Sequence, residues 1–376
     1  MWRWRGPDEL NSSPKSPSCM DISTDRSMAS KDPRYGSLIP TLDLSPRDEK
    51  LLVGQALDLV HEAVEDAKRL QRNNHGERAV WKEVRRWGTI QVFRERHPVG
   101  ALPQVLAVGH IAGTLGGIVY GAMAATPGDV LVNARCMGEP TQDAKVLCVL
   151  HEPSTDQPFQ YIDVKWLSFL VGNGLGSPRD CTVVDAVGFV RLPSGEHLSY
   201  VLRHSVDFDA LPSLSKWGVV RANVAICALY RQVAAGTLQC FVRSFYDLGS
   251  NIWKPIGVKF ATDRALAMCK FVECAEMKKL ARLWSLVGRC SDWGDYTRPS
   301  FALTCSVCHN RKAKPALLIT ASKKKQRNGC AMCRRDACAR CLHKKTIHSM
   351  AADERVTTRK LRVCTSCLQE ALRTSI

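Results

Sequence analysis

Apolar residues recur at helical spacing in the stretch that follows Ser45-Pro46. The repeating positions are Leu52, Ala56, Leu59, Val60, Ala63, Val64, Ala67 and Leu70. Steps of three and four residues place these side chains on one helix face. Ser45 is a candidate N-cap, and proline is favoured at the first helical position. The pattern predicts an amphipathic helix that ends near Leu70, before the polar run at residues 73–76.

Further along the chain, apolar and polar residues alternate at the spacing of two that is typical of strands. One strand is predicted at Thr89–Arg96. The segment Gly109–Val130 predicts a strand, a turn and an apolar helix that ends at Thr126-Pro127-Gly128. Several strands follow between Asp143 and Leu248, with Pro or Gly in their turns. Short connections of this kind favour an antiparallel meander.

A last apolar face, on residues 262–287, predicts one long C-terminal helix. A helix, a curved antiparallel sheet and a long helix in this order predict an α+β domain. The segment at residues 1–42 is rich in Ser, Pro, Asp and Lys and is predicted to be disordered.

Composition adds limits to this picture. The chain has 376 residues, of which 45% are hydrophobic and 24% charged, as expected for a soluble protein of two or three domains. The sequence contains no uninterrupted apolar run of about eighteen residues, so no membrane span is predicted. The first residues lack the apolar core of a secretory signal, so we expect a cytoplasmic protein.

The 17 cysteines fall into two groups. Nine are scattered singly between Cys19 and Cys290, and we expect them to pack as small apolar side chains with free thiols. The other eight form four Cys-x-x-Cys pairs within the last 72 residues. In a reducing compartment such pairs predict metal ligands rather than disulfides.

The spacing of these eight cysteines predicts how they group. The second and third pairs are separated by only four residues, too few for both to close on one ion without strain. The first pair is therefore expected to join the third, and the second the fourth. Four thiolates suit a closed tetrahedral zinc site. The prediction is two zinc ions, one held by Cys305, Cys308, Cys338 and Cys341, the other by Cys330, Cys333, Cys364 and Cys367.

Basic residues gather in the same region. From residue 294 onward there are 18 Lys and Arg against 5 Asp and Glu, a net charge of +13, out of +17 for the whole chain. Two four-thiolate zinc sites would offset only part of this charge. The cysteine module is therefore expected to bind an anionic partner.

Residues 141–287 resemble the START family of lipid-transfer domains. The resemblance extends N-terminally to about residue 48 and implies a START-like domain at residues 48–290. The similarity lies in PFQYIDVKW (Pro158–Trp166), SPRDCTVVDAVGFV (Ser177–Val190) and SYVLRHSVDF (Ser199–Phe208). The resemblance implies a helix-grip fold, with an apolar tunnel for a lipid between the sheet and the C-terminal helix. Arg179 and Asp180 match the Arg-Asp pair of that family. They are candidates for an ion pair near the tunnel, or for a structural salt bridge at the start of a strand.

No catalytic role is predicted. None of the ten histidines is paired with Cys or Ser in a recognisable catalytic motif. The expected function is therefore non-enzymatic.

Residues 298–376 resemble a FYVE-type zinc finger, as in oomycete proteins that join a START-like domain to such a finger. The resemblance rests on the four-residue gap between the middle pairs and on Arg362-Val363-Cys364. It implies binding to phosphoinositide on endosomal membranes. This chain keeps the basic stretch before the third cysteine but lacks the family's histidine pair and its WxxD motif, which is replaced by Trp293-Gly294-Asp295-Tyr296.

These departures favour binding to acidic membrane by charge, without stereospecific recognition. The candidate contacts are Lys323, Lys324, Lys325, Arg327 and Arg362. Nucleic acid is a less favoured partner, because the module lacks an aromatic platform and a recognition helix. Two alternatives remain open. A RING-like finger would make the protein a ubiquitin ligase, and loss of both ligands would leave a protein-interaction scaffold.

Overall fold

The structure is a computed structural model that describes residues 2–4, 35–72, 80–98, 102–174, 176–249, 252–289, 304–311 and 329–373. The chain forms two compact units, Met1–Val272 and Glu273–Ile376. The first unit contains the large sheet, and the second contains the cysteine module. No helix in the described ranges is both long enough and apolar enough to cross a bilayer.

The sheet of the first unit is antiparallel along its main path, as the alternating pattern predicts. Its strand order is β2-β3-β4-β11-β10-β8-β7-β6-β5, and the short β9 adds a parallel pairing to β7. The strands are β2 (Trp81–Trp87), β3 (Ile90–Glu95), β4 (Val105–Ala112), β5 (Thr141–His151), β6 (Tyr161–Phe169), β7 (Arg179–Arg191), β8 (His197–Phe208), β9 (Val220–Arg221), β10 (Asn223–Ala234) and β11 (Thr237–Asp247). Consecutive strands from β5 to β8 pair directly, which confirms the meander.

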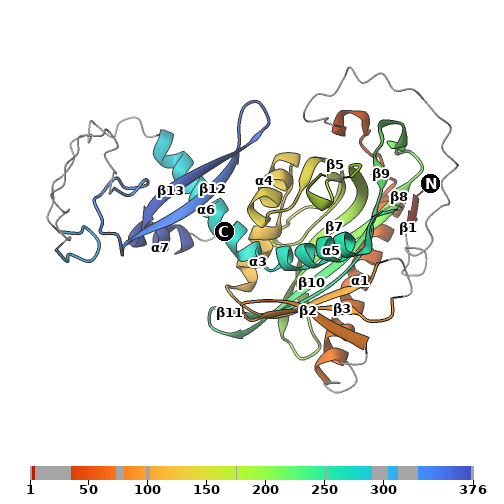
Figure 1. Cartoon of the computed structure of the whole chain (residues 1–376), viewed down its shortest axis with the longest axis horizontal. Coiled ribbons are helices and arrows are strands. Elements are labelled where there is room, and N and C mark those ends of the chain that lie inside the picture. Colours follow the sequence, from red (N-terminus) through yellow and green to blue (C-terminus); the bar gives the residue numbers. More distant parts are fainter. Residues whose placement is uncertain are drawn as a thin grey trace. The chain divides into compact units, whose positions relative to one another are not determined.

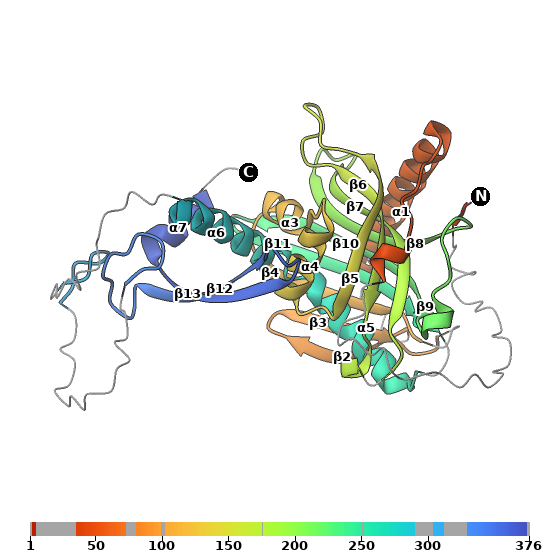
Figure 2. The same ribbon diagram turned by 90° about the horizontal axis from the view of Figure 1, so that it is seen from above.

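The predicted first helix is present as α1, which spans Pro46–Arg72. The Ser45 hydroxyl accepts a hydrogen bond from the Asp48 backbone N–H at 3.2 Å, so Ser45 caps the helix. The apolar face of α1 packs on one face of the sheet, where Leu52, Ala56 and Val60 are at most 1% exposed. Figures 1 and 2 show α1 against this face and α5 (Lys254–Met268) across the opposite one.

Helix α5 is fixed to the sheet by aromatic contacts and one hydrogen bond. The Phe260 ring stacks on Phe169 with centroids 5.5 Å apart and meets the edge of Tyr246 at 5.3 Å. The Tyr230 hydroxyl donates to the Met268 carbonyl at 2.7 Å. The fold is thus α+β, with a curved antiparallel sheet that grips a C-terminal helix, as predicted.

The predicted single helix at residues 262–287 is wrong in its continuity. Helix α5 ends at Met268, and α6 spans Phe271–Arg289. At the break, the Cys269 N–H bonds to the Leu266 carbonyl at 3.1 Å, in the tight geometry common at helix ends. The apolar spacing runs on through this turn, so the pattern could not reveal it. Leu280 of α6 belongs to the apolar core of the cysteine module.

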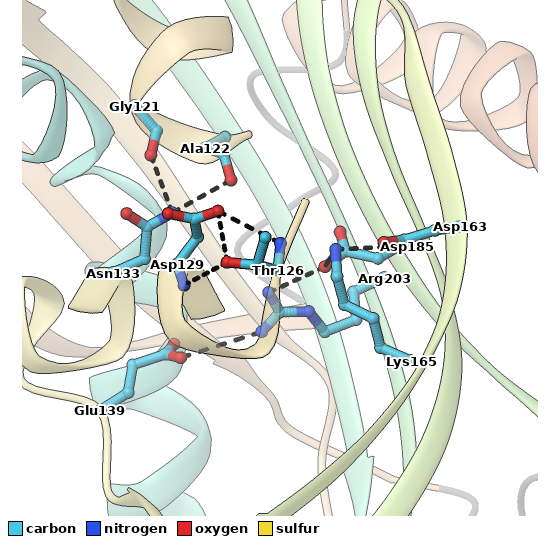
Figure 3. A network of polar contacts seen from close by, with 10 residues as sticks. All are labelled: Gly121, Ala122, Thr126, Asp129, Asn133, Glu139, Asp163, Lys165, Asp185 and Arg203. Atoms are coloured by element: carbon cyan, nitrogen blue, oxygen red, sulfur yellow. Dashed lines mark hydrogen bonds and ion pairs between the residues drawn. The ribbon is translucent and has the colours of Figure 1, made fainter. Parts of the chain in front are cut away.

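The region around Thr126 also differs from the prediction. Helix α3 ends earlier, spanning Leu115–Ala122, and Thr126 begins a further helix, α4 (Pro127–Met137). The Thr126 hydroxyl accepts from the Asp129 N–H at 3.1 Å, and the Asp129 carboxylate accepts from the Thr126 N–H at 3.2 Å (Figure 3). This capping box shows that Thr-Pro-Gly-Asp starts a helix here rather than ending one.

Part of the segment predicted to be disordered is ordered. Trp2–Trp4 forms the short strand β1, which pairs with β8, and Gly36–Leu38 forms the 3-10 helix η2. The Gly36 N–H donates to the Asp143 carboxylate at 2.7 Å, and Ile39 is 1% exposed in the core shared with α1. Residues 5–34 lie outside the described ranges, so the prediction is untested there.

The described single cysteines, Cys136 to Cys274, are free thiols, which agrees with the prediction. Burial raises the pKa of Cys181 and of Cys227 to about 12. Both therefore stay protonated near neutral pH and behave as apolar side chains. Cys19 and Cys290 lie outside the described residues.

Candidate functional site

The structure brings the eight paired cysteines of the second unit into two clusters. One contains Cys305, Cys308, Cys338 and Cys341, and the other Cys330, Cys333, Cys364 and Cys367. Within each cluster all the Sγ atoms lie within 4.8 Å of one another. These are the two sets that the spacing predicts, with the first pair beside the third and the second beside the fourth.

The sulfur separations fit a metal ion better than a disulfide. The Sγ atoms of Cys308 and Cys338 are 3.8 Å apart, as are those of Cys333 and Cys364. Zinc bound tetrahedrally at about 2.3 Å leaves neighbouring sulfurs about 3.8 Å apart. A disulfide would need about 2.0 Å. All eight cysteines are free thiols, so each cluster could hold one zinc ion.

The first two pairs sit in matching backbone turns. The Cys305 N–H bonds to Asn310 O at 3.0 Å, and the Cys330 N–H bonds to Arg335 O at 2.9 Å. The residue after each second cysteine, His309 or Arg334, has a positive φ, of 57° and 58° respectively. This left-handed residue turns the chain back on itself, so that both sulfurs of a pair point to one centre.

Backbone N–H groups also point at the sulfurs. Cys305 Sγ accepts from the Cys338 N–H at 3.2 Å, and Cys330 Sγ accepts from the Cys364 N–H at 3.2 Å. Although burial raises it, the pKa of the Cys305 thiol falls to about 6, because the N–H groups of Cys308, Cys338 and Val307 stabilise the thiolate. The thiolate is the form that binds metal.

The remainder of the module is a hairpin and a helix around a small core. Strands β12 (Leu342–Met350) and β13 (Val356–Cys364) pair along their whole length, and α7 spans Thr365–Arg373. Ile347 and Val363 point to the buried side, at 2% and 0% exposure. Apolar side chains of α6 complete this core, which also contains the cysteines. The module has so few buried apolar residues that metal would contribute much of its folding energy.

The opposite face of the hairpin is basic. Lys344 lies directly across from Arg362, and Lys360 is two residues along β13 on the same face. Among the described residues, none of these three has a carboxylate within salt-bridge distance. Lys323, Lys324, Lys325 and Arg327, the other predicted membrane contacts, lie outside the described residues. Arg362 was predictable from the sequence, whereas Lys344 is placed beside it only by the register of the two strands.

In the first unit, Arg179 and Asp180 do not pair with each other. The Asp180 carboxylate accepts two hydrogen bonds from Arg221, both at 2.9 Å, and one from the Trp166 indole at 2.8 Å. The Arg179 guanidinium donates to the carbonyl oxygens of Ser177 and Leu248. Asp180 thus ties the start of β7 to β6 and β9, and Arg179 ties it to the segments that contain Ser177 and Leu248. Their contact with a lipid stays a prediction.

Charged residues occupy the face of the sheet beneath α5. Six of them form a continuous chain of ion pairs: Asp163, Lys165, Asp185, Arg203, Glu139 and Arg264. Figure 3 shows the first five of these side chains pointing toward one another. Lys165 lies 2.9 Å from Asp163 and 3.2 Å from Asp185. Three acids and three bases balance, so the network is neutral overall.

Burial shifts the proton affinities within this network. Burial raises the pKa of Asp163 to about 6, and although Lys165 lowers it, Asp185 raises it further. Burial would also raise the pKa of Asp185, but the cations of Lys165 and Arg203 hold it below its usual value. Of the two aspartates beside Lys165, Asp163 is therefore the one that takes up a proton more readily.

An apolar cavity of about 480 Å³ lies on the other face of the sheet, against α1. The family resemblance implied a lipid tunnel between the sheet and the C-terminal helix, so this cavity lies on the side of the sheet opposite to that expectation. It is lined chiefly by Val64, Ala67, Leu70, Trp81, Phe93, Leu106, Val108, Leu192, Leu198, Leu229 and Phe241. Neither Arg179 nor Asp180 lines it. A volume of this size is in the range of small-molecule sites.

Comparison with known proteins gives matches among solved structures only. No protein-family model matches the chain, and no curated protein matches it. Human StAR-related lipid transfer protein 5 is 17% identical, with a TM-score of 0.42 over 58% of this chain and 97% of that one. Human STARD10 is 13% identical, with a TM-score of 0.42 over 58% and 82%. An aromatase/cyclase from a Streptomyces species is 11% identical, with a TM-score of 0.26 over 45% and 93%.

Proposed function

We propose that the protein is a non-enzymatic adaptor that binds a lipid in its first unit and an acidic membrane surface through a two-zinc, FYVE-like second unit. Its place would be the cytoplasm, peripherally on endosomal or other acidic membranes. The observation that carries this proposal is the basic face of the β12–β13 hairpin beside two four-cysteine clusters.

The exposed face of the hairpin places two like charges opposite each other. Lys344 and Arg362 are cross-strand neighbours, and like charges directly opposite each other destabilise a sheet. No described carboxylate relieves them. A surface of anionic headgroups would do so, at about 1 kcal/mol for each basic residue held close to it. The arrangement costs stability in the free protein and favours the bound one.

The two cysteine clusters would hold this basic face in a fixed position. Bound zinc would tie the two halves of the module together and fix the ends of the hairpin, since Cys341 precedes β12 and Cys364 ends β13. Point charges on a rigid hairpin attract any anionic surface, whereas recognition of one phosphoinositide needs donors fixed on individual phosphates. We therefore expect selectivity for charge rather than for one headgroup.

Lipid binding by the first unit is supported by its apolar cavity against α1 and by the helix-grip arrangement. All eight predicted ligands of the second unit are cysteines, whereas a RING finger usually has a histidine among them. This favours a membrane-binding finger over a ubiquitin ligase.

Two measurements test the proposal. Co-sedimentation with phosphatidylserine vesicles should show binding that weakens steeply above physiological salt, where the screening length falls below about 8 Å. Native mass spectrometry of purified protein should show two zinc ions and a co-purified lipid. The proposal would be contradicted if the protein did not bind acidic vesicles at low salt. Autoubiquitination in the presence of a conjugating enzyme would also contradict it.

A further inference from the structure

We propose that the first unit binds a single-chain anionic amphiphile along α1, with the chain in the 480 Å³ cavity and the charged end beside Arg191. The ligand chemistry is one long alkyl chain with a carboxylate or phosphate. This inference rests on the proposed lipid binding and adds the place and the class of ligand.

The register of the strands gives the cavity a continuous apolar floor. Phe241 pairs with Leu229 on β10 and with Val108 on β4, so their side chains lie side by side on one face. Leu106 pairs with Phe93 in the same way and extends that face toward the sheet edge. The floor is therefore a layer of adjacent apolar side chains across four strands.

Helix α1 forms the roof of the cavity, and only its first half packs tightly against the sheet. Leu52 and Ala56 in its first half are fully buried, whereas Ala67 and Leu70 near its end are only partly buried and line the cavity. An apolar cavity left empty costs stability, because its walls lose packing contacts. An alkyl chain would restore those contacts. A volume of 480 Å³ is in the lower half of the usual range for ligand sites and suits one chain better than two.

A second cavity of about 380 Å³ adjoins the first and supplies the polar end. The two share Val64, Lys68 and Leu192 in their walls. The second is otherwise lined by His61, Glu65, Arg191 and Pro193. Apolar and basic surfaces thus follow each other along one side of α1.

The cations near this end differ in whether a carboxylate neutralises them. Lys68 is 2.7 Å from Glu65, and Arg231 at the rim of the first cavity is 2.9 Å from Glu196. Arg191 has no carboxylate within salt-bridge distance among the residues that the structure describes. It is the cation left to pair with an anionic headgroup, and an arginine suits both carboxylate and phosphate.

The test uses delipidated, zinc-loaded full-length protein and isothermal titration with palmitate, 1-palmitoyl-lysophosphatidic acid and hexadecanol. Ala67→Phe, which fills the cavity from the helix, should weaken palmitate binding at least about tenfold. Val108→Phe fills it from the sheet, and thermal unfolding reports whether either variant is folded. Arg191→Gln should weaken both anions about threefold and leave hexadecanol unchanged.

Matched controls lie on the same helix. Gly54→Phe adds the same ring where nothing lies within 4 Å, and Lys50→Gln removes an exposed charge, so both should bind as wild type does. Binding of only one of the two anions supports the proposal and identifies the headgroup.

A palmitate that carries a diazirine locates the chain. Labelling of peptides from α1, β10 and β11 is expected. Labelling of α5 instead, or undiminished binding by a folded Ala67→Phe protein, overturns this site while leaving lipid binding intact. A wild-type protein that takes up no palmitate and carries no co-purified lipid overturns both this inference and lipid binding by the first unit.

Discussion

Lys344 of β12 and Arg362 of β13 are direct cross-strand neighbours on the face of the hairpin opposite the buried Ile347. Two cations in this relation repel each other in the free protein. Function and stability should therefore respond in opposite directions when one cation is removed.

The first prediction follows from this opposition. Changing both Lys344 and Arg362 to Thr should stabilise the second unit by up to about 1 kcal/mol, because the repulsion disappears and threonine suits strands. The same change should weaken binding to phosphatidylserine vesicles by about 2 kcal/mol. Thermal unfolding and vesicle sedimentation measure the two effects. The control is Arg355→Thr, since Arg355 lies 3.9 Å from Asp353 and is already compensated. A double variant that loses stability would show that the two cations are structural.

A second prediction concerns the buried Asp180. Arg221→Ala leaves this carboxylate, which is 1% exposed, without its main partner, and should cost about 3 kcal/mol of unfolding free energy. The matched control is Arg231→Ala. It breaks the more exposed pair with Glu196, which should cost less than about 1 kcal/mol. Urea unfolding of both variants makes the comparison. Equal losses would mean that Asp180 gains no more from Arg221 than a surface carboxylate gains from its partner.

The sequence predicted some features better than others, for physical reasons. Cysteine pairing was predictable because two residues between ligands, and only four between the middle pairs, leave few ways to close two metal sites. The position of the cavity was not. Strand β6 is buried along its whole length, so Ile162 and Val164 on one face, and Asp163 and Lys165 on the other, are all covered. Alternation that would ordinarily mark a solvent face here marks a buried charge network.

The third prediction concerns that network and pH. The folded-state pKa of Asp163, about 6, is above its ordinary value of 3.8, so the folded protein binds this proton more tightly than the unfolded chain does. The contribution of Asp163 to stability therefore grows as the pH falls through 6 and is complete near 4. It is lost as the pH rises, and amounts to at most about 3 kcal/mol.

Asp163→Asn tests this sign. Between pH 7 and pH 5, wild type should gain unfolding free energy relative to the variant, as measured by urea unfolding at each pH. Asp58→Asn, at an exposed position on α1, should show no such relative change. If wild type instead loses stability relative to Asp163→Asn on acidification, the ionised carboxylate is the form that the Lys165 pairing stabilises.

The last prediction concerns metal and the extent of the second unit. Cys330→Ser removes one of four ligands at the second cluster, and should reduce the zinc content from two ions to one, as measured by plasma mass spectrometry. The apolar core of this module includes Leu280 of α6 together with Cys330 and Cys364. Loss of the metal should therefore expose α6 as well as the hairpin. Limited proteolysis should then cut beyond Glu273, while residues 48–272 stay protected.

The control is Cys227→Ser. Cys227 lies in the first unit, outside both clusters, so this variant should keep both zinc ions. Protection that extends to residue 290 in Cys330→Ser would instead place α6 with the first domain, as the sequence alone had predicted.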